Sequence, residues 1–351
     1  MNIEQIPFSM AGSYLAVSKL PEGTESPAYE EGVCLRTIHG MNYMPGFTMM
    51  RSIPFFARLI PVEGGAETPY QIQASTDEVC LKTEKGFIGI CFGNRRTLLI
   101  RGQGAGLKLV CAAGNFAQHL CWEGREYLFM NCRTNDRRFA LRCQTGQLAL
   151  KKETDREGRA REIVLCGPAG GDGASAPRPE RPANCAEQSD APHGDWLLVL
   201  EDVAPDWVPQ RESFDYEVCR AARQRELELF AASMPQAPER YLETAKLASY
   251  VDWSCLVAKE GALTRDAMLM SKNWMCNVWS WDHCFNAIAL SYHNPKLAWD
   301  QFMLLFDYQD GLGALPDSVS DAFVARSFLK PPIHGWALMK MLEHMEPDEE
   351  Q

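Results

Sequence analysis

One short segment, residues 272–295, combines aromatic, acidic, imidazole and thiol side chains in an otherwise apolar run, "KNWMCNVWSWDHCFNAIALSYHNP". Residues three or four positions apart share one face of a helix, so a helix over residues 279–292 would carry two stripes. The apolar stripe consists of Trp281, Phe285, Ile288 and Tyr292. The second stripe consists of Trp279, Asp282, His283 and Asn286.

The second stripe has the groups that bind a sugar. Indole rings stack on apolar C–H faces, while a carboxylate, an imidazole and an amide offer donors and acceptors to hydroxyls. A single His or Asp is more often a structural hydrogen-bonding group, and that alternative stays open for His283. Burying the whole stripe beside tryptophan without a ligand would be costly. The segment therefore predicts a carbohydrate site.

Two later segments add candidate residues to this site. Residues 306–321, "FDYQDGLGALPDSVSD", predict a loop at the mouth of a helix that offers Asp310 and Asp317. Calcium binding is the competing interpretation, but the spacing misses the EF-hand pattern. Residues 328–338, "FLKPPIHGWAL", place His334 and Trp336 after a stiff proline pair, where the alternative is a rigid helix start.

The surrounding pattern predicts which elements position these residues. Short apolar runs separated by turn residues, about ten positions apart, indicate an antiparallel β-sandwich over residues 1–208. A Gly- and Pro-rich stretch, 167–195, predicts a flexible excursion between strands. Helical periodicity then predicts a linker helix at 209–237 and a helical domain at 238–351. Six cysteines recur at strand spacing and are read as small buried side chains, not metal ligands: Cys80, Cys91, Cys111, Cys121, Cys132 and Cys143.

Composition narrows the functional classes. The chain has 351 residues, 46% hydrophobic and 23% charged, with a net charge of −11, which argues against nucleic acid or an anionic membrane as partner. A membrane-spanning apolar run and a signal peptide are not evident. Thirteen cysteines, an odd number without a CxxC pair, favour reduced thiols and a cytoplasmic location. We expect no cofactor and no metal.

Three motifs in this order, "WSWDHCFNAIAL", "QFMLLFDYQDGLGALPD" and "KPPIHGWAL", resemble the (α/α)6-toroid glycosidases, especially the glycoside hydrolase family 63 and trehalase-like group. The resemblance covers about residues 240–345. It implies a β-sandwich followed by an incomplete (α/α)6 toroid, and inverting hydrolysis of α-glucosidic bonds in an oligosaccharide or glycoside substrate. Asp282 would hold sugar hydroxyls, the indoles of Trp279, Trp281 and Trp336 would form walls, and Asp310, Asp317 and His334 would complete the site.

The chain departs from that family's pattern in its catalytic groups. Inversion needs an acid and a base about 6.5–9.5 Å apart, and the family's Ser-Gly-x-Asp-Asn segment is not found. The chain therefore resembles the N-terminal part of such an enzyme and is expected to be inactive alone. The alternative is a non-catalytic carbohydrate-binding or structural remnant. A partial toroid also predicts self-association or a partner chain through Met339, Leu342 and Met345.

Overall fold

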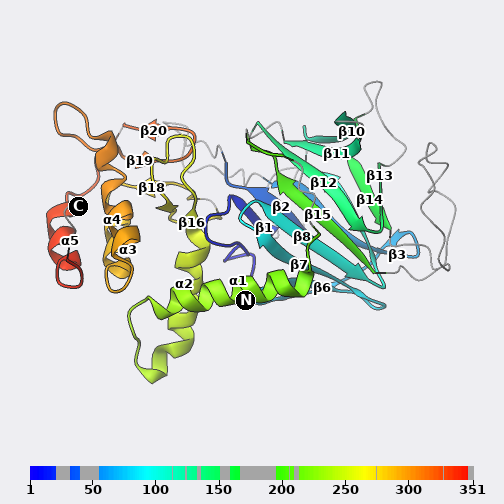
Figure 1. The fold of residues 1–351 in the computed structure, drawn as a ribbon, viewed down its shortest axis with the longest axis horizontal. Coiled ribbons are helices and arrows are strands. Elements are labelled where there is room, and N and C mark those ends of the chain that lie inside the picture. The colour runs from blue at the N-terminus through cyan, green and yellow to red at the C-terminus, as the bar shows by residue number, and fades with distance from the viewer. Residues whose placement is uncertain are drawn as a thin grey trace. The chain divides into compact units, whose positions relative to one another are not determined.

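The protein is described here from a computed structural model (Figure 1). It describes residues 1–20, 32–39, 55–112, 114–122, 125–132, 136–150, 159–166, 195–204, 206–208, 213–273, 275–326 and 328–346. The predicted excursion at 167–195 lies outside the described residues, Asp195 excepted. The chain divides into two compact units. The first comprises Met1–Glu4, Val17–Arg36 and Phe55–Arg220, and the second Gln5–Ala16, Thr37–Pro54 and Ala221–Gln351.

Two large sheets dominate the first unit. The strands of one sheet follow in the order β1 (Leu15–Leu20), β2 (Gly32–Thr37), β3 (Phe55–Glu63), β9 (Gly106–Cys111), β14 (Glu162–Cys166) and β13 (Gln147–Leu150). A short further strand, β4 (Ala66–Glu67), pairs with β3. The other has the order β10 (Phe116–Trp122), β11 (Arg125–Cys132), β12 (Arg137–Thr145), β15 (Trp196–Asp202), β8 (Thr97–Gln103), β7 (Phe87–Asn94), β6 (Val79–Lys82), β5 (Gln71–Ala74). The pairings with a defined register are antiparallel, which confirms the predicted antiparallel sheets.

Apolar side chains from both sheets form the core of this unit. Phe56 of β3 stacks on Phe139 of β12 with ring centroids 4.0 Å apart. Cys91, Cys111 and Cys132 are buried free thiols on three strands, as small core side chains. Burial raises the pKa of the Cys111 thiol to about 12, so this thiol stays protonated at neutral pH.

One glycine in this core is required by close packing. Gly102 on β8 lies opposite Trp196 on β15, a fully buried side chain. A Cβ at Gly102 would lie 2.3 Å from the Trp196 indole, and this ring donates its N–H to the carbonyl of Ala105 at 2.8 Å. The strand therefore needs glycine at this position for the indole to fit.

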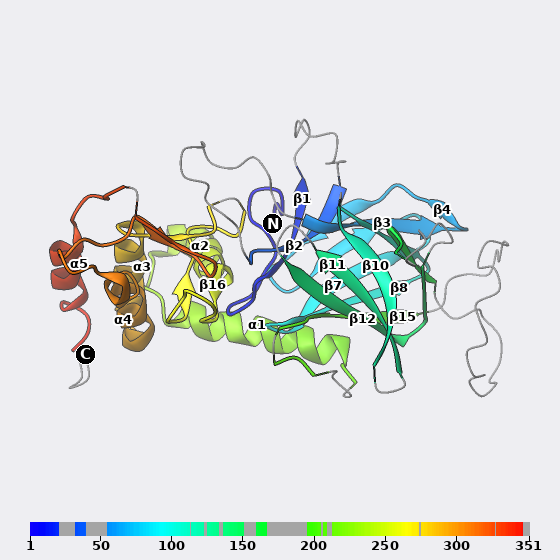
Figure 2. The same cartoon turned by 90° about the horizontal axis from the view of Figure 1, so that it is seen from above.

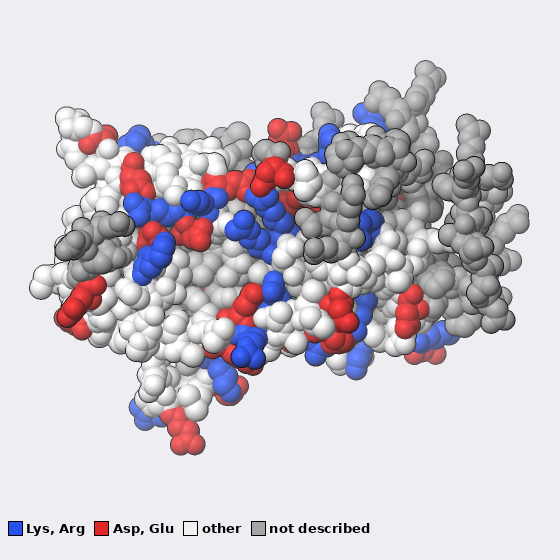
Figure 3. Space-filling model, in the orientation of Figure 1, with Lys and Arg blue, Asp and Glu red and all other residues white. Residues whose placement is uncertain are grey.

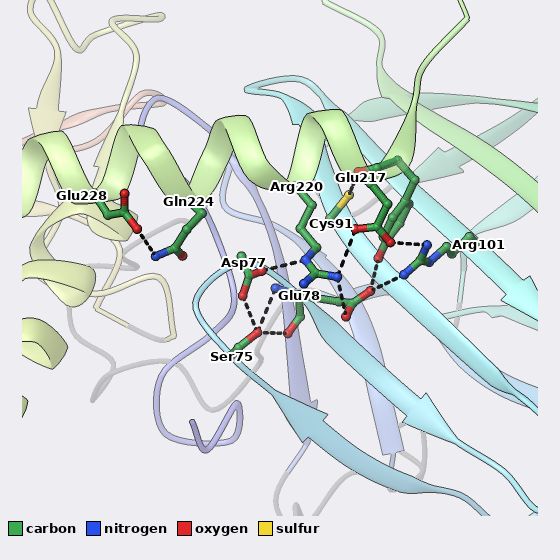
Figure 4. A network of polar contacts seen from close by, with 10 residues as sticks. Ser75, Asp77, Glu78, Cys91, Arg101, Glu217, Arg220, Gln224 and Glu228 are labelled. Carbon is green, nitrogen blue, oxygen red and sulfur yellow. Dashed lines mark hydrogen bonds and ion pairs between the residues drawn. The ribbon is translucent and has the colours of Figure 1, made fainter.

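Polar contacts fix the first turn of α1 (Tyr216–Ala232) on the first unit (Figure 4). Arg220 donates from Nε to Asp77 at 2.7 Å, and the Tyr216 hydroxyl donates to Glu78 at 2.8 Å. Arg101 pairs with Glu217 at 2.6 Å. A linker helix was predicted over 209–237, α1 begins at Tyr216, and these contacts show how its start is held.

The second unit contains short sheets and the remaining helices (Figures 1 and 2). Its helical elements are η1 (Glu239–Tyr241), α2 (Leu242–Cys255), α3 (Asp282–Leu290), α4 (Pro295–Met303), η2 (Phe306–Tyr308) and α5 (His334–Met341). Its strands are β16 (Leu256–Val257), β17 (Ala267–Met268), β18 (Val278–Trp279), β19 (Ser318–Val319) and β20 (Val324–Ala325). Among the described residues, no helix has the length and apolarity needed to cross a membrane.

Two sequence-based expectations need correction in this unit. The predicted helix over 279–292 begins only at Asp282, because Val278 and Trp279 pair with β19 instead. Met345 is buried, packed in the core that α3, α4 and α5 share, whereas Met339 and Leu342 are 65% and 42% exposed. Burial of Met345 follows from its place after α5, where the chain continues along the same core.

A buried lysine joins the Gln5–Ala16 segment to the rest of the second unit. Lys272 is 2% exposed. Its ammonium group donates to the carbonyls of Ser13, Leu256 and Met10 at 2.5, 2.9 and 3.2 Å and to the Ser9 hydroxyl at 3.1 Å. Burial lowers the pKa of Lys272 to about 7.

Acidic and basic side chains of the described residues lie next to one another on the face that Figure 3 displays. In the second unit, Arg265 donates to both oxygens of Asp307, at 2.8 and 3.0 Å, and also reaches Asp300 at 3.2 Å.

Candidate functional site

Two of the three sequence motifs are joined by the small sheet of the second unit. Trp279 on β18 lies opposite Ser318 on β19. The amide of Ser280 donates to the carbonyl of Asp317 at 3.0 Å, and the amide of Asp317 donates to the carbonyl of Ala325 at 2.7 Å. These backbone bonds bring the Trp-Asp segment and the acidic loop together just before α3 begins.

Lys330, from the third motif, completes this group. Its ammonium group lies 2.7 Å from a carboxylate oxygen of Asp317 and 5.8 Å from the ring centroid of Trp279. Asp317 is buried, with 3% exposure. Such a pair is held together because a buried carboxylate without a counter-charge is strongly unfavourable. Lys330 stands in the third sequence motif, but no role could be predicted for it, since a lone lysine in a loop is usually solvated.

Asp282 lies at the first position of α3, close enough to Lys330 for their charges to interact. Burial raises the pKa of Asp282, and the neighbouring Lys330 charge acts in the opposite direction. The group of Trp279, Asp282, Asp317 and Lys330, called the acidic cluster below, therefore brings two carboxylates, an ammonium group and an indole together. Trp279 and Asp317 are buried, with 8% and 3% exposure, and Asp282 and Lys330 are its partly exposed members.

Exposed aromatic rings follow α3 and α5. The Trp281 and Phe285 ring centroids lie 6.2 Å apart, and those of Phe285 and Trp336 lie 6.0 Å apart. Phe285 is 47% and Trp336 50% exposed. Trp281 is partly exposed. These three residues, called the aromatic row below, are thus accessible to differing degrees, and exposed rings are what a sugar-stacking surface requires.

Of the two predicted histidines, His283 is buried and His334 is partly exposed. His283 is 1% exposed and its Nδ1 lies 3.0 Å from the carbonyl of Trp279. The ring centroids of His283 and His334 are 5.2 Å apart. Burial lowers the pKa of His283 to about 4 and also lowers the pKa of His334, so both rings are neutral at pH 7. His283 and Asp282 point in different directions because consecutive helix positions are rotated by about 100°.

Two further predicted residues make contacts away from the acidic cluster. Asn286 donates to the carbonyl of Met268 at 3.5 Å. The Asp310 carboxylate accepts from the amides of Leu312 and Ala314, both at 2.9 Å, and these bonds lower its pKa. Asp310 thus closes its own turn, which accounts for an acidic residue in a glycine-rich loop without a ligand.

Comparison with known proteins gives two findings. Residues 275–350 match the family model of the mannosylglycerate hydrolase MGH1-like glycoside hydrolase domain. The fold is similar to the solved structure of the GH92 family glycosyl hydrolase CcMan5, with a TM-score of 0.52, 11% sequence identity and 96% of this chain covered. The match covers 51% of that chain, so this chain spans about half the length of the matched structure. A comparison with curated proteins gives no match.

The family match includes α3, α4 and α5 and both tryptophan-containing motifs. The matched residues overlap the part of the chain, about residues 240–345, whose motifs resemble those of glycosidases. Residues 275–350 are therefore a glycoside hydrolase-like domain, within a chain whose fold is similar to that of a glycosyl hydrolase.

Proposed function

We propose that the second unit binds the sugar substrate of a glycoside hydrolase, and that the enzyme belongs with the inverting (α/α)6-toroid glycosidases acting on α-glucosidic bonds. The observation that carries this proposal is the acidic cluster, in which Lys330 lies 2.7 Å from Asp317 and 5.8 Å from the Trp279 ring. Residues from three separate motifs meet there. The sandwich packing of the two sheets and the partial toroid belong to the same proposal.

The acidic cluster and the aromatic row would play complementary parts. Carboxylates of Asp282 and Asp317 accept hydrogen bonds from sugar hydroxyls, and Lys330 donates one. The exposed ring of Trp336 and the partly exposed ring of Trp281 stack on the apolar faces of the sugar. The buried His283 ring would support the site without contacting the sugar, and the partly exposed His334 ring lies beside it, with centroids 5.2 Å apart.

Catalytic roles are not assigned to the acidic residues. An inverting mechanism needs a protonated carboxylic acid and a carboxylate base on opposite sides of the bond. The pKa of Asp282 is raised, the direction that suits an acid, whereas the pKa values of Asp307 and Asp310 are lowered. A second carboxylate across from Asp282 would still be needed, so the proposal concerns binding.

The test is calorimetric titration and glycan-array binding of the purified 351-residue polypeptide. The array should carry α-linked gluco-oligosaccharides, α-linked manno-oligosaccharides and mannosylglycerate, because the matched family model is named for a mannosylglycerate hydrolase. Asp282→Asn should weaken binding roughly ten- to one-hundred-fold, since hydrogen bonds to a charged group contribute about 1.5–3 kcal/mol. Trp336→Ala should weaken it roughly three- to ten-fold.

Two exposed residues serve as matched controls for these variants. Asp310→Asn changes a carboxylate outside the acidic cluster, and Tyr241→Ala removes an aromatic ring that is 50% exposed on η1. Both should bind as the wild type does. Binding without hydrolysis of aryl α-glucosides would favour a carbohydrate-binding protein over an enzyme. No binding to any glycan, with all variants folded, would contradict the proposal.

Self-association through α5 is a separate part of the proposal. Met339 lies on this helix and Leu342 directly follows it, with 65% and 42% exposure, and neighbouring exposed apolar side chains are typical of interaction surfaces. We propose that a second copy of this chain covers them.

A further inference from the structure

A group of three metal-ligating side chains, two of them buried, lies next to the proposed sugar site in the second unit. His283 and Cys284 are consecutive residues of α3, and His334 begins α5. Their ligand atoms all lie within 4.8 Å of one another, and Cys284 Sγ is 3.8 Å from His283 Nε2. His283 and Cys284 are 1% and 0% exposed.

Both imidazoles contact backbone carbonyls, and each also has a ring nitrogen close to the other members of the group. Nδ1 of His283 lies 3.0 Å from the carbonyl of Trp279, and the tautomer that donates from Nδ1 leaves the lone pair on Nε2. His334 interacts with the backbone carbonyl of Ser280, while its Nε2 is buried without a hydrogen-bond partner in the described structure. Metal-binding histidines generally donate their other N–H to a carbonyl in this manner.

An unpartnered buried imidazole nitrogen costs free energy that a ligand would recover. The backbone carbonyl of Phe302 also interacts with the His283 ring. The competing arrangement is therefore a neutral His283 that donates its single ring N–H to one of the two carbonyls, because a neutral imidazole cannot donate to both. That arrangement leaves Nε2 of His334 unsatisfied, whereas a shared ion would satisfy both rings.

We propose that His283, Cys284 and His334 bind a transition-metal ion of the zinc class, through the two Nε2 atoms and the thiolate. Nitrogen and sulfur donors together favour Zn²⁺ and similar ions over Mg²⁺ or Ca²⁺. Tetrahedral zinc with Zn–N near 2.0–2.1 Å and Zn–S near 2.3 Å places its ligand atoms about 3.3–3.6 Å apart. The separation of 3.8 Å between Cys284 Sγ and His283 Nε2 is already close to this value.

Binding requires that the Cys284 thiol gives up its proton to solvent and that both imidazoles are neutral. Three protein ligands leave the fourth position for water. The ion would join the first turn of α3 to the first turn of α5. These turns also carry Asp282 and Trp336, so the bound ion would fix the position of these two residues relative to each other in the proposed sugar site.

The test uses the full chain after chelator treatment, titrated with Co²⁺ as a spectroscopic substitute for Zn²⁺. Wild type should develop near-ultraviolet thiolate-to-cobalt absorption together with the visible bands of tetrahedral cobalt. An excess of Zn²⁺ should displace Co²⁺ and abolish both the near-ultraviolet and the visible absorption. Cys284→Ser should lose the thiolate absorption, and His334→Ala should bind at least about ten-fold more weakly. The controls Cys80→Ser and His293→Ala, changed at positions outside the cluster, should behave as the wild type.

A measurement on the wild type keeps the proposal testable when a variant does not fold. X-ray absorption of the zinc-loaded chain should show one sulfur near 2.3 Å and nitrogens near 2.0–2.1 Å. Coordination by oxygen alone would overturn the proposal. So would thiolate absorption that persists in a folded Cys284→Ser variant, since the chain holds thirteen cysteines.

Discussion

Lys272 provides a quantitative test of how the second unit is held together. Its side chain is buried, it contacts four oxygen atoms, and burial lowers its pKa to about 7. The ordinary lysine value near 10.4 applies in the unfolded chain. Between these two values the unfolded state binds a proton that the folded state does not. The free energy of unfolding should therefore rise with pH above about 7.

The magnitude follows from the two pKa values. Below pH 7 both states are protonated and the penalty of burying the charge is fully present. From pH 6 to pH 8.5 this penalty is relieved by about 2 kcal/mol. Lys272→Met cannot titrate and should lack this increase. At pH 8.5 the variant should be less stable than the wild type by about 1–3 kcal/mol, because the Ser13 carbonyl loses its donor. At pH 6 the difference should be close to zero.

Urea denaturation at pH 6, 7 and 8.5, followed by tryptophan fluorescence, measures this difference, because six of the nine tryptophans follow residue 220. Lys246→Met is the matched control. Lys246 is an exposed lysine on α2, with a side chain 70% exposed and paired with Glu243, and its removal should have a small effect at every pH. The same pH dependence in Lys272→Met and wild type would refute the reasoning, as would a larger loss of stability at pH 6 than at pH 8.5.

Three further changes test other parts of the fold. Gly102→Ala should lower the stability of the first unit by about 1–3 kcal/mol in thermal denaturation, because its Cβ would overlap Trp196, while Gly311→Ala, with open space around it, should not. Arg265→Lys should lower the stability of the second unit by about 0.5–1 kcal/mol at low salt, since the two-pronged contact with Asp307 is lost; a loss that is equal at high salt would argue against an electrostatic origin. Met339→Lys should shift any dimer seen by light scattering to monomer without loss of helical circular dichroism, and an unchanged dimer would exclude α5 from the interface.

The strands and helices could be predicted because their signals are local. Alternating apolar residues and turn residues mark most strands of the two large sheets, and the change to helical periodicity marks α1 and α2. The two-residue strands β4 and β16–β20 were not predicted, because so short a strand has no periodic pattern of its own. The start of α3 was misplaced by three residues, since Trp279 is removed from the helix by pairing with Ser318, a residue far away in the sequence. A periodic pattern contains no information about such a partner.

Site residues were predictable only where the residue type itself is unusual for its position. An aspartate among tryptophans indicated Asp282, and the structure brings Trp279 and Asp317 into contact with the same lysine. The contacts of Lys330 and Lys272 were not predicted, because the sequence around a lysine does not show whether its ammonium group will be paired or buried. Asp310 was grouped with the site by its sequence neighbours, although its carboxylate bonds its own turn.

The contrast between the acidic cluster and the aromatic row bears on how a sugar would be recognised. Asp317 is buried and already paired with Lys330, so its geometry is set before any ligand arrives. Phe285 and Trp336 are about half exposed and can adjust to a ring that stacks on them. Prearranged charged groups lose little entropy on binding and reject a sugar whose hydroxyl is misplaced, because they would be left unpaired. Under the proposed function, discrimination between sugars would therefore reside in Asp282, Asp317 and Lys330, and the aromatic row would contribute affinity shared by many glycans.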